Sequence, residues 1–195
     1  MRVSSLYVCF VLLAASSLFG QRTYTNWQEY LGGPDSSHYS PLKQINRGNV
    51  DKLQAVWTYE TGDDISYTFS PLVVDNVAYF AAKGGSLVAV DASTGKELWV
   101  HPFEHAPGMP AAFARFSGIA GQRGGNYWES KDRSDRRLFV SASGFLHAID
   151  AKTGKLVDSF ADHGKLDLKI GLDRAPRGLS SRSAGRVFGN ILILG

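Results

Sequence analysis

The sequence predicts an all-β protein built from a repeated four-stranded unit. The stretch Ser70–Trp99 contains four short runs rich in β-branched and aromatic residues, and turn residues bound each run. Four such strands in a row form an antiparallel meander, and a meander that recurs along a chain is the building unit of a β-propeller. The segment Arg136–Phe160 repeats the pattern, and Gly185–Gly195 begins it again. We therefore expect about two to three propeller blades.

The first unit defines the expected strands. They are Leu72–Asp75, Val77–Ala82, Ser86–Asp91 and a fourth that starts at Lys96, separated by turns at Asp75-Asn76, Gly84-Gly85 and Ala92–Gly95. Trp99 falls on the fourth, outer strand, where we expect it to pack between neighbouring blades. In the second unit the equivalent position is Asp158, with Phe160 two residues later, so the packing aromatic is displaced or absent there.

A shared turn signature supports the repeat. Ala89–Lys96 aligns with Ala148–Lys155, and both contain an aspartate followed by Thr-Gly-Lys. An aspartate at a strand end can accept hydrogen bonds from backbone N–H groups two residues on, which favours a turn. The glycine supplies the positive φ that other residues resist.

The first ~20 residues are expected to lie outside the fold. Arg2 is followed by an apolar run that is too short to span a bilayer, and then by small residues up to Gly20. We interpret residues 1–20 as a secretory signal peptide cleaved before Gln21, with a buried helix or an uncleaved anchor as the alternative. The single cysteine, Cys9, lies within this segment, so the mature chain would have no thiol.

Charge argues against nucleic-acid binding. The 195-residue chain has a net charge of +3 and no long basic run. Its arginines between residues 123 and 137 are interleaved with Asp132 and Asp135, which is not typical of a nucleic-acid surface.

The stretch between the signal peptide and the first unit is mostly loop. Residues 46–53 are expected to form one short helical turn capped by Asn49, with Val50 and Leu53 facing inwards. Trp57–Glu60 alternates like a strand and is interpreted as part of the outer strand of a preceding unit.

The order of residues in this part of the chain resembles a known family. The residues that carry the resemblance are Trp27, Tyr30, Gly32-Gly33, His38–Leu42, Ile45, Asn49-Val50, Leu53, Trp57 and Thr61–Asp63. Together they resemble the amino terminus of the pyrroloquinoline quinone (PQQ)-dependent dehydrogenases, the quinoproteins of the glucose, quinate and alcohol dehydrogenase superfamily. Arg136-Arg137, Gly154–Leu156 and Phe160–Gly164 fit the glucose and quinate branch.

The resemblance implies an eight-bladed propeller, of which residues 21–195 would be an incomplete amino-terminal part. It implies an enzyme that oxidises a sugar or alcohol hydroxyl and is either periplasmic or secreted, with the outer face of the inner membrane as one location. The implied cofactors are PQQ and calcium, and the implied electron acceptor is a membrane quinone or a cytochrome. The catalytic base and the calcium ligands would lie beyond Gly195, so no catalytic or metal residue is assigned. A chain of this extent is not expected to bind PQQ tightly or to turn over alone.

Two residues are implied as cofactor contacts. Arg123, in an Arg-Gly-Gly-Asn-Tyr-Trp segment, would bind a carboxylate or ring oxygen of PQQ, since a guanidinium fork pairs with a planar anion at two points. Gly124 and Gly125 would let the backbone approach the flat ligand. Thr68 stands where the family often has an acidic contact and is a weaker candidate. Trp128 replaces a histidine that is frequent in the glucose branch, which leaves the substrate open.

Alternative interpretations remain. Arg123 could be a solvated loop arginine beside core aromatics, and the chain could belong to a non-enzymatic envelope scaffold built from PQQ-like repeats. Such scaffolds share the Asp-x-x-Thr-Gly-Lys-x-x-Trp repeat but generally lack the Arg123–Trp128 segment. The histidines show no metal-ligand spacing, and solvated or capping roles are expected for His101, His105, His147 and His163.

Overall fold

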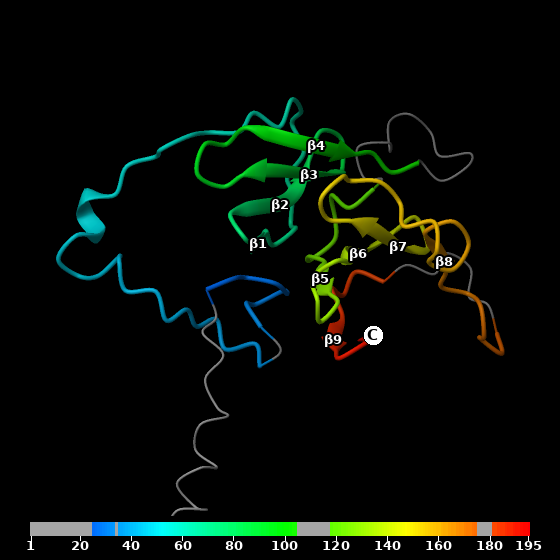
Figure 1. The fold of residues 1–195 in the computed structure, drawn as a ribbon. Helices are drawn as coiled ribbons and strands as arrows, with labels where there is room; N and C mark the ends of the chain where they lie inside the picture. Colours follow the sequence, from blue (N-terminus) through cyan, green and yellow to red (C-terminus); the bar gives the residue numbers. More distant parts are fainter. Residues whose placement is uncertain (1–24, 34, 105–117, 175–180) are drawn as a thin grey trace, which may run out of the picture.

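The described chain forms two four-stranded antiparallel sheets and one two-stranded hairpin, as expected for successive propeller blades (Figure 1). The computed structural model describes residues 25–33, 35–104, 118–174 and 181–195. The segment interpreted as a signal peptide, residues 1–20, lies outside the described residues. No helix within the described ranges is long and apolar enough to cross a membrane.

The first sheet follows the predicted meander closely. Its strands are β1 (Leu72–Val74), β2 (Val77–Ala82), β3 (Ser86–Asp91) and β4 (Glu97–His101), hydrogen-bonded in chain order. The β1–β2 turn has positive φ at Asp75 and Asn76, 50° and 64°. Two successive positive φ angles match the twist of a tight hairpin, and Asp and Asn tolerate them better than most residues. The strand and turn assignments of this unit are therefore confirmed, with shifts of one residue at two strand ends.

The second sheet repeats the order, and a third unit begins after it. The second sheet contains β5 (Asn126–Glu129), β6 (Arg136–Ala142), β7 (Phe145–Asp150) and β8 (Lys165–Asp167). The hairpin of β9 (Arg186–Phe188) and β10 (Ile191–Ile193) then confirms the third repeat. The expected two to three blades are thus present.

The outer strand of the second sheet departs from the prediction. Leu156 pairs with Ile149 as expected, but the chain then leaves the sheet and returns to place Lys165 opposite His147. The intervening turns put Phe160 against Phe139, with ring centroids 5.5 Å apart. The Gly- and Arg-rich composition of the polar stretch after Phe160 predicts a long connecting loop, and this prediction is wrong at residues 165–167, where the interrupted outer strand resumes as β8.

The repeated turn signature works as predicted. The Oδ1 atom of Asp91 accepts from the backbone N–H groups of Ser93 and Thr94, both at 2.9 Å. The Oδ1 atom of Asp150 accepts from the N–H groups of Lys152 and Thr153, at 3.1 and 2.7 Å. Each aspartate thereby fixes the turn that leads into the outer strand.

Trp99 joins the two sheets, as expected. Its indole N–H donates to the carbonyl oxygen of Ala151 at 3.2 Å, and its ring covers Gly154 in the turn of the second sheet. Trp57 makes the same pair of contacts one unit earlier, to the Ala92 carbonyl at 3.0 Å and to Gly95. The glycine of each turn signature is therefore also the residue on which a tryptophan of the preceding unit packs.

A glycine-to-alanine pair tests this contact. In Gly154→Ala the new Cβ would lie 2.6 Å from the Trp99 ring at a φ of 71°. In Gly84→Ala the φ is 75° but nothing lies within 4 Å, so only the backbone cost applies. We expect the Gly84 variant to lose about 1 kcal/mol of unfolding free energy and the Gly154 variant about 2–3 kcal/mol, measured by urea denaturation. Equal losses would show that the tryptophan contact contributes nothing.

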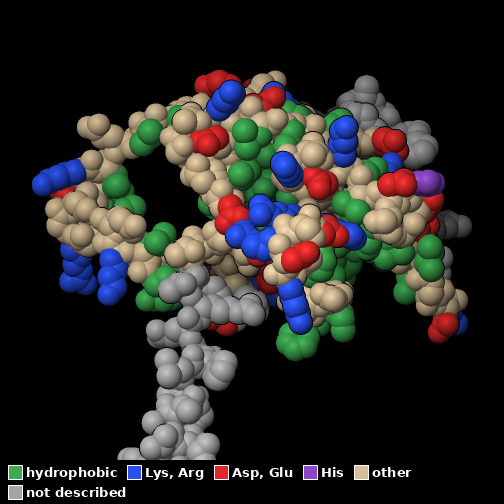
Figure 2. Space-filling model, in the orientation of Figure 1, with side chains coloured by type: hydrophobic (Ala, Val, Ile, Leu, Met, Phe, Trp, Pro, Cys, Tyr) green, Lys and Arg blue, Asp and Glu red, His purple; other side chains and the backbone are tan. Residues whose placement is uncertain are grey.

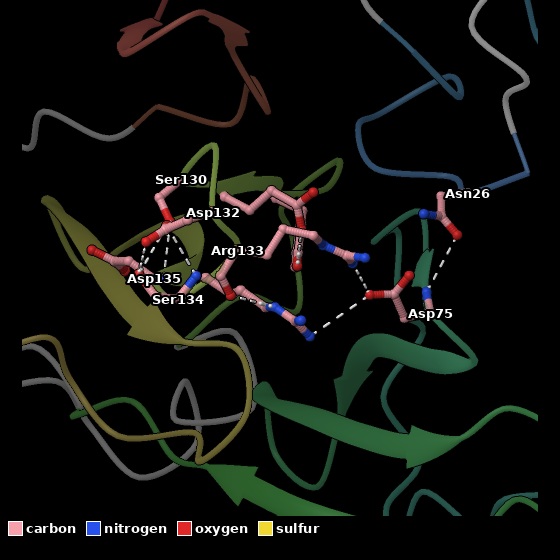
Figure 3. Close-up of polar contacts among 10 residues, drawn as sticks. Asn26, Asp75, Ser130, Asp132, Arg133, Ser134 and Asp135 are labelled. Atoms are coloured by element: carbon pink, nitrogen blue, oxygen red, sulfur yellow. Dashed lines mark hydrogen bonds and ion pairs between the residues drawn. The ribbon is translucent and has the colours of Figure 1, made fainter.

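One hydrophobic core runs through both sheets. Leu72 and Leu87 of the first sheet and Leu138 and Ile149 of the second are buried in the same cluster. The two sheets are also joined by an ion pair between Asp75 in the β1–β2 turn and Arg133 in the loop after β5, as Figure 3 shows. The sheets are thus joined by apolar packing, a tryptophan and an ion pair.

Residues 39–56 form an arc that leaves the body of the molecule (Figure 1). The arc carries the 3-10 helix η2 (Val50–Lys52), and Figure 2 shows open space between it and the sheets. Val50 and Leu53 are more than half exposed, so the prediction that they face inwards was wrong. The Asn49 side chain accepts from the N–H of Asn46 rather than capping the helix. The extended run Trp57–Glu60 is not a strand, since no strand of the described chain pairs with it.

Candidate functional site

A cavity of about 820 Å³ lies where three segments that precede inner strands converge. We name them the pre-strand segments: residues 68–71 before β1, 121–125 before β5 and 182–185 before β9. The side chains and backbone that line the cavity are those of Tyr30, Leu31, Thr68, Gly121, Arg123, Arg182, Ser183, Ala184, Gly185, Arg186, Ile193, Leu194 and Gly195. The cavity is therefore a product of the repeat, since equivalent places in successive units meet there.

Backbone hydrogen bonds tie the pre-strand segments to one another. The N–H of Ser70 donates to the carbonyl of Arg123 at 2.9 Å, and the N–H of Arg123 donates to the carbonyl of Arg182 at 3.3 Å. The buried side-chain amide of Asn126 at the start of β5 donates to the Ala184 carbonyl. These bonds fix the backbones of the three segments relative to each other, so residues from separate units are held around one cavity.

Arg123 and Thr68, the two residues implied as cofactor contacts, both line this cavity. The structure thus brings together residues that lie far apart in the sequence. The hydroxyl of Thr68 donates to the carbonyl of Gln122 at 3.2 Å. Since its proton is used by the backbone, Thr68 offers a ligand mainly lone pairs, unless the hydroxyl rotates.

The cavity has a cationic lining. Arg123 and Arg182 are both exposed, and within the described ranges neither guanidinium makes a hydrogen bond or an ion pair. No acidic side chain is among the lining residues. Two guanidinium groups facing one space without an intramolecular carboxylate form a site for an anion with several acceptor oxygens.

Arg182 was not identified from the sequence. It lies in a polar stretch that was interpreted as a connecting loop. The signal that could have found it is its position, since Arg182 stands just before β9 as Thr68 stands before β1 and Arg123 before β5. A repeat alignment that included the residues in front of each inner strand would have placed all three on one surface.

The glycines after Arg123 do not approach the cavity. Neither Gly124 nor Gly125 lines it, and a Cβ on Gly125 would lie 3.0 Å from the carbonyl oxygen of Phe139. Gly125 therefore permits close packing of β5 against β6, and the expectation that the two glycines let the backbone approach a flat ligand stays a prediction. Trp128 also lies elsewhere, where its indole N–H donates to the Gly189 carbonyl at 3.0 Å.

The described histidines lie in no metal-ligand cluster. Among the described residues no group of three or more His, Cys, Asp or Glu side chains could hold a metal ion. His163 is exposed beside Asp158, as expected. His147 is only 5% exposed, which corrects the prediction of a solvated or capping role. It packs against Phe103, with ring centroids 5.0 Å apart, while His105 lies outside the described ranges.

The burial of His147 predicts a pH-dependent stability. Burial, followed by the nearby positive charges of Lys165 and His101, lowers the pKa of His147 to about 4. An unfolded histidine takes up its proton near pH 6.5, so the unfolded chain binds more protons between these values and the fold loses stability as the pH falls. We expect the unfolding free energy, measured by urea denaturation, to fall by up to about 3 kcal/mol between pH 6.5 and pH 4.

The matched variant for this prediction is His147→Phe, which keeps a buried ring and removes the titration. The unfolding free energy of this variant should fall clearly less than that of the parent chain over the same pH range. The residual slope would come in part from His101, whose pKa burial also lowers. An unchanged pH dependence would assign the effect to other groups.

Comparisons with known proteins point to one family. Residues 27–195 match the family described as PQQ: glucose/ethanol/alcohol dehydrogenase, β-propeller domain. The chain is 38% identical over 132 residues to the dehydrogenase subunit of alcohol dehydrogenase (quinone) from Gluconacetobacter polyoxogenes, covering 68% of this chain and 17% of the relative. It is 30% identical over 172 residues to quinoprotein glucose dehydrogenase of Escherichia coli K12, covering 79% and 21%.

Among solved structures, quinohemoprotein alcohol dehydrogenase from Comamonas testosteroni matches with a TM-score of 0.66 and 26% sequence identity. That match covers 100% of this chain and 25% of the other. Quinate/shikimate dehydrogenase (quinone) from Acinetobacter baylyi is 29% identical over 192 residues. The chain therefore spans roughly a fifth of the length of the curated relatives it matches.

Proposed function

Because the chain belongs to the PQQ-dependent glucose/ethanol/alcohol dehydrogenase β-propeller family, we propose that its cavity forms part of a PQQ site. The site would serve an enzyme that oxidises a hydroxyl group of a sugar or an alcohol. The observation that carries the proposal is the placement of Arg123 and Arg182 on one cavity that no acidic side chain lines.

The donor set fits the cofactor. PQQ is a flat molecule with three carboxylates, and a guanidinium fork binds a planar carboxylate through two parallel hydrogen bonds. Arg123 and Arg182 would each hold one anionic group, and their fixed backbones would orient the ring system between them. Thr68 would add a weaker polar contact at the β1 side. When bound, PQQ would supply the acceptor for the hydride equivalent that leaves the substrate carbon.

The remaining parts of the proposal rest on the family and on the sequence. We propose that electrons pass to a membrane quinone or a cytochrome, and that the protein works in the periplasm or outside the cell. The apolar residues 1–20 support that location, which includes the outer face of the inner membrane. Calcium as a second cofactor rests on the family alone, because its ligands are expected beyond Gly195.

The scaffold alternative is less well supported. A non-enzymatic propeller needs the turn signature and the tryptophans, which the chain has, but it has no use for a cationic cavity. Two exposed arginines brought together by backbone bonds between separate units favour a ligand site over a purely structural ring.

The proposal is tested by titrating PQQ into the expressed chain and following the quenching of tryptophan fluorescence. We expect saturable binding with a dissociation constant in the micromolar range or weaker, on the order of 10 μM or above. Binding should weaken as salt rises, because exposed arginines supply the attraction. Absence of saturable binding up to about 1 mM PQQ would contradict the proposal.

A variant of Thr68 tests the minor contact. In Thr68→Val the shape is kept and the hydroxyl is removed. Because the hydroxyl proton already serves the Gln122 carbonyl, we expect PQQ affinity to fall by less than about threefold. A tenfold or larger loss in the same titration would show that Thr68 rotates to donate to the ligand.

A further inference from the structure

A short segment before the first sheet crosses the inner edges of both sheets. We call residues Asn26–Gly33 the leader. Trp27 exchanges two backbone hydrogen bonds with Val73 of β1, at 2.7 and 2.9 Å, and the Gln28 carbonyl accepts from the N–H of Tyr127 in β5 at 3.0 Å. The Asn26 side chain also accepts from the N–H of Asp75, as drawn in Figure 3. The first half of the leader is therefore held by sheet edges.

The second half of the leader reaches the cavity without such pairing. Tyr30 and Leu31 line the cavity, and the backbone turns back there through a hydrogen bond from Gly32 to Glu29. Leu31 has a φ of 71°, the left-handed region that a branched side chain seldom adopts. A conformation of this kind persists only where surrounding contacts hold it.

Arg186 at the start of β9 supplies these contacts. One terminal nitrogen of its guanidinium donates to a carboxylate oxygen of Glu29 at 3.0 Å and to the carbonyls of Tyr30 and Gly33 at 3.0 and 2.9 Å. The other terminal nitrogen donates to the hydroxyl of Ser36. The acceptors lie on both sides of Leu31, so a single side chain clamps the whole turn.

The ion pair inside this clamp is well shielded. The Glu29 side chain is 6% exposed and that of Arg186 is 29% exposed. Removing one partner of such a pair leaves the other charge without compensation, so the clamp resists opening. It also joins the leader to the third unit, because Glu29 belongs to the leader and Arg186 begins β9.

We propose that Arg186 is a positioning residue that sets Tyr30 and Leu31 as a wall of the cavity by gripping the leader. The inference rests on the proposed function, because it takes the cavity as the PQQ site. Arg186 differs from Arg123 and Arg182 in that its terminal nitrogens are used within the protein. It acts on the ligand through the leader.

The test compares three variants of the full chain by hydrogen exchange and by PQQ titration. The reporters are the amides of Gly32 and His38, which donate to the carbonyls of Glu29 and Leu31. Arg186→Gln removes the charge, and Arg186→Lys keeps the charge but not the fork. Arg137→Gln is the matched control, because Arg137 is 20% exposed and pairs with Asp135 away from the cavity.

In Arg186→Gln we expect exchange at Gly32 and His38 to rise about tenfold and PQQ affinity to fall about tenfold, since several charge-assisted hydrogen bonds are lost. Arg186→Lys should show smaller changes in the exchange rates and in PQQ affinity. Arg137→Gln should leave the exchange rates and the affinity as in the parent chain. Should Arg186→Gln not fold, Glu29→Gln, which is nearly isosteric, gives the same comparison.

The outcomes separate the two proposals. Unchanged exchange at both amides overturns the positioning role. Faster exchange with unchanged PQQ affinity also overturns it, because the leader then has no effect on the ligand. If the parent chain does not bind PQQ at all, the proposed function fails, and the exchange result alone decides whether Arg186 holds the cavity wall.

Discussion

Replacement of Arg123 by glutamine is expected to weaken PQQ binding on the order of a hundredfold. Arg123 lines the cavity, and its backbone is fixed by hydrogen bonds to Ser70 and Arg182, so its side chain can reach a bound anion without a movement of the backbone. A bidentate bond to a carboxylate is among the strongest polar contacts that a protein makes. Glutamine keeps most of the side-chain length but loses both the charge and the fork.

The matched control is Arg47→Gln, which removes the same charge from an exposed arginine on the arc of residues 39–56. It should leave the PQQ titration within about twofold of the parent, because the arc lies apart from the cavity. Arg182→Gln should behave like Arg123→Gln. If Arg123→Gln binds PQQ like the parent chain, the arginine has no role in binding, and the interpretation of a solvated loop arginine would be correct.

Truncation of Trp99 to alanine should have the largest effect on stability. The indole fills the space between the sheets, contacts Tyr79 with ring centroids 5.8 Å apart, and bonds to the Ala151 carbonyl. Its loss leaves a gap in the contact between the sheets, and the Ala151 carbonyl keeps only the hydrogen bond from the Tyr79 hydroxyl at 3.3 Å. We expect a loss of about 3–5 kcal/mol of unfolding free energy, from urea denaturation followed by circular dichroism.

Two further variants separate packing from the hydrogen bond. Trp99→Phe keeps much of the ring and loses the N–H donor, so it should fall between the parent and the alanine variant. Trp128→Ala removes a tryptophan that bonds to the hairpin turn at Gly189, and it should cost less than Trp99→Ala. Equal losses for the two alanine variants would contradict the role of Trp99 as the joint between the sheets.

The regular parts of the fold were predictable because they rest on local chemistry. The strands of the first sheet follow from β-branched runs bounded by turn residues, and the Asp91 and Asp150 turns follow from bonds within a few residues. The late start of β8 was not predictable, since it depends on the contact of Phe160 with Phe139 across the sheet. The inward direction assigned to Val50 and Leu53 failed for a similar reason, as the arc has no surface to bury them.

The candidate site was predictable only in part. Arg123 and Thr68 came from a resemblance between sequences, which does not show that they share a cavity. Arg182 was missed because no local pattern marks a residue before a strand. The Arg186–Glu29 pair joins residues whose partnership exists only after the units have assembled, so neither residue could be recognised alone.

The central claim is that the three pre-strand segments together form the PQQ site. It is tested most directly by hydrogen exchange mapped by mass spectrometry, with and without saturating PQQ. We predict that peptides covering residues 68–71, 121–125 and 182–186 gain protection together, while the turns at Asp75-Asn76 and Gly189-Asn190 do not change. Protection confined to one segment, or located at those turns, would contradict the claim.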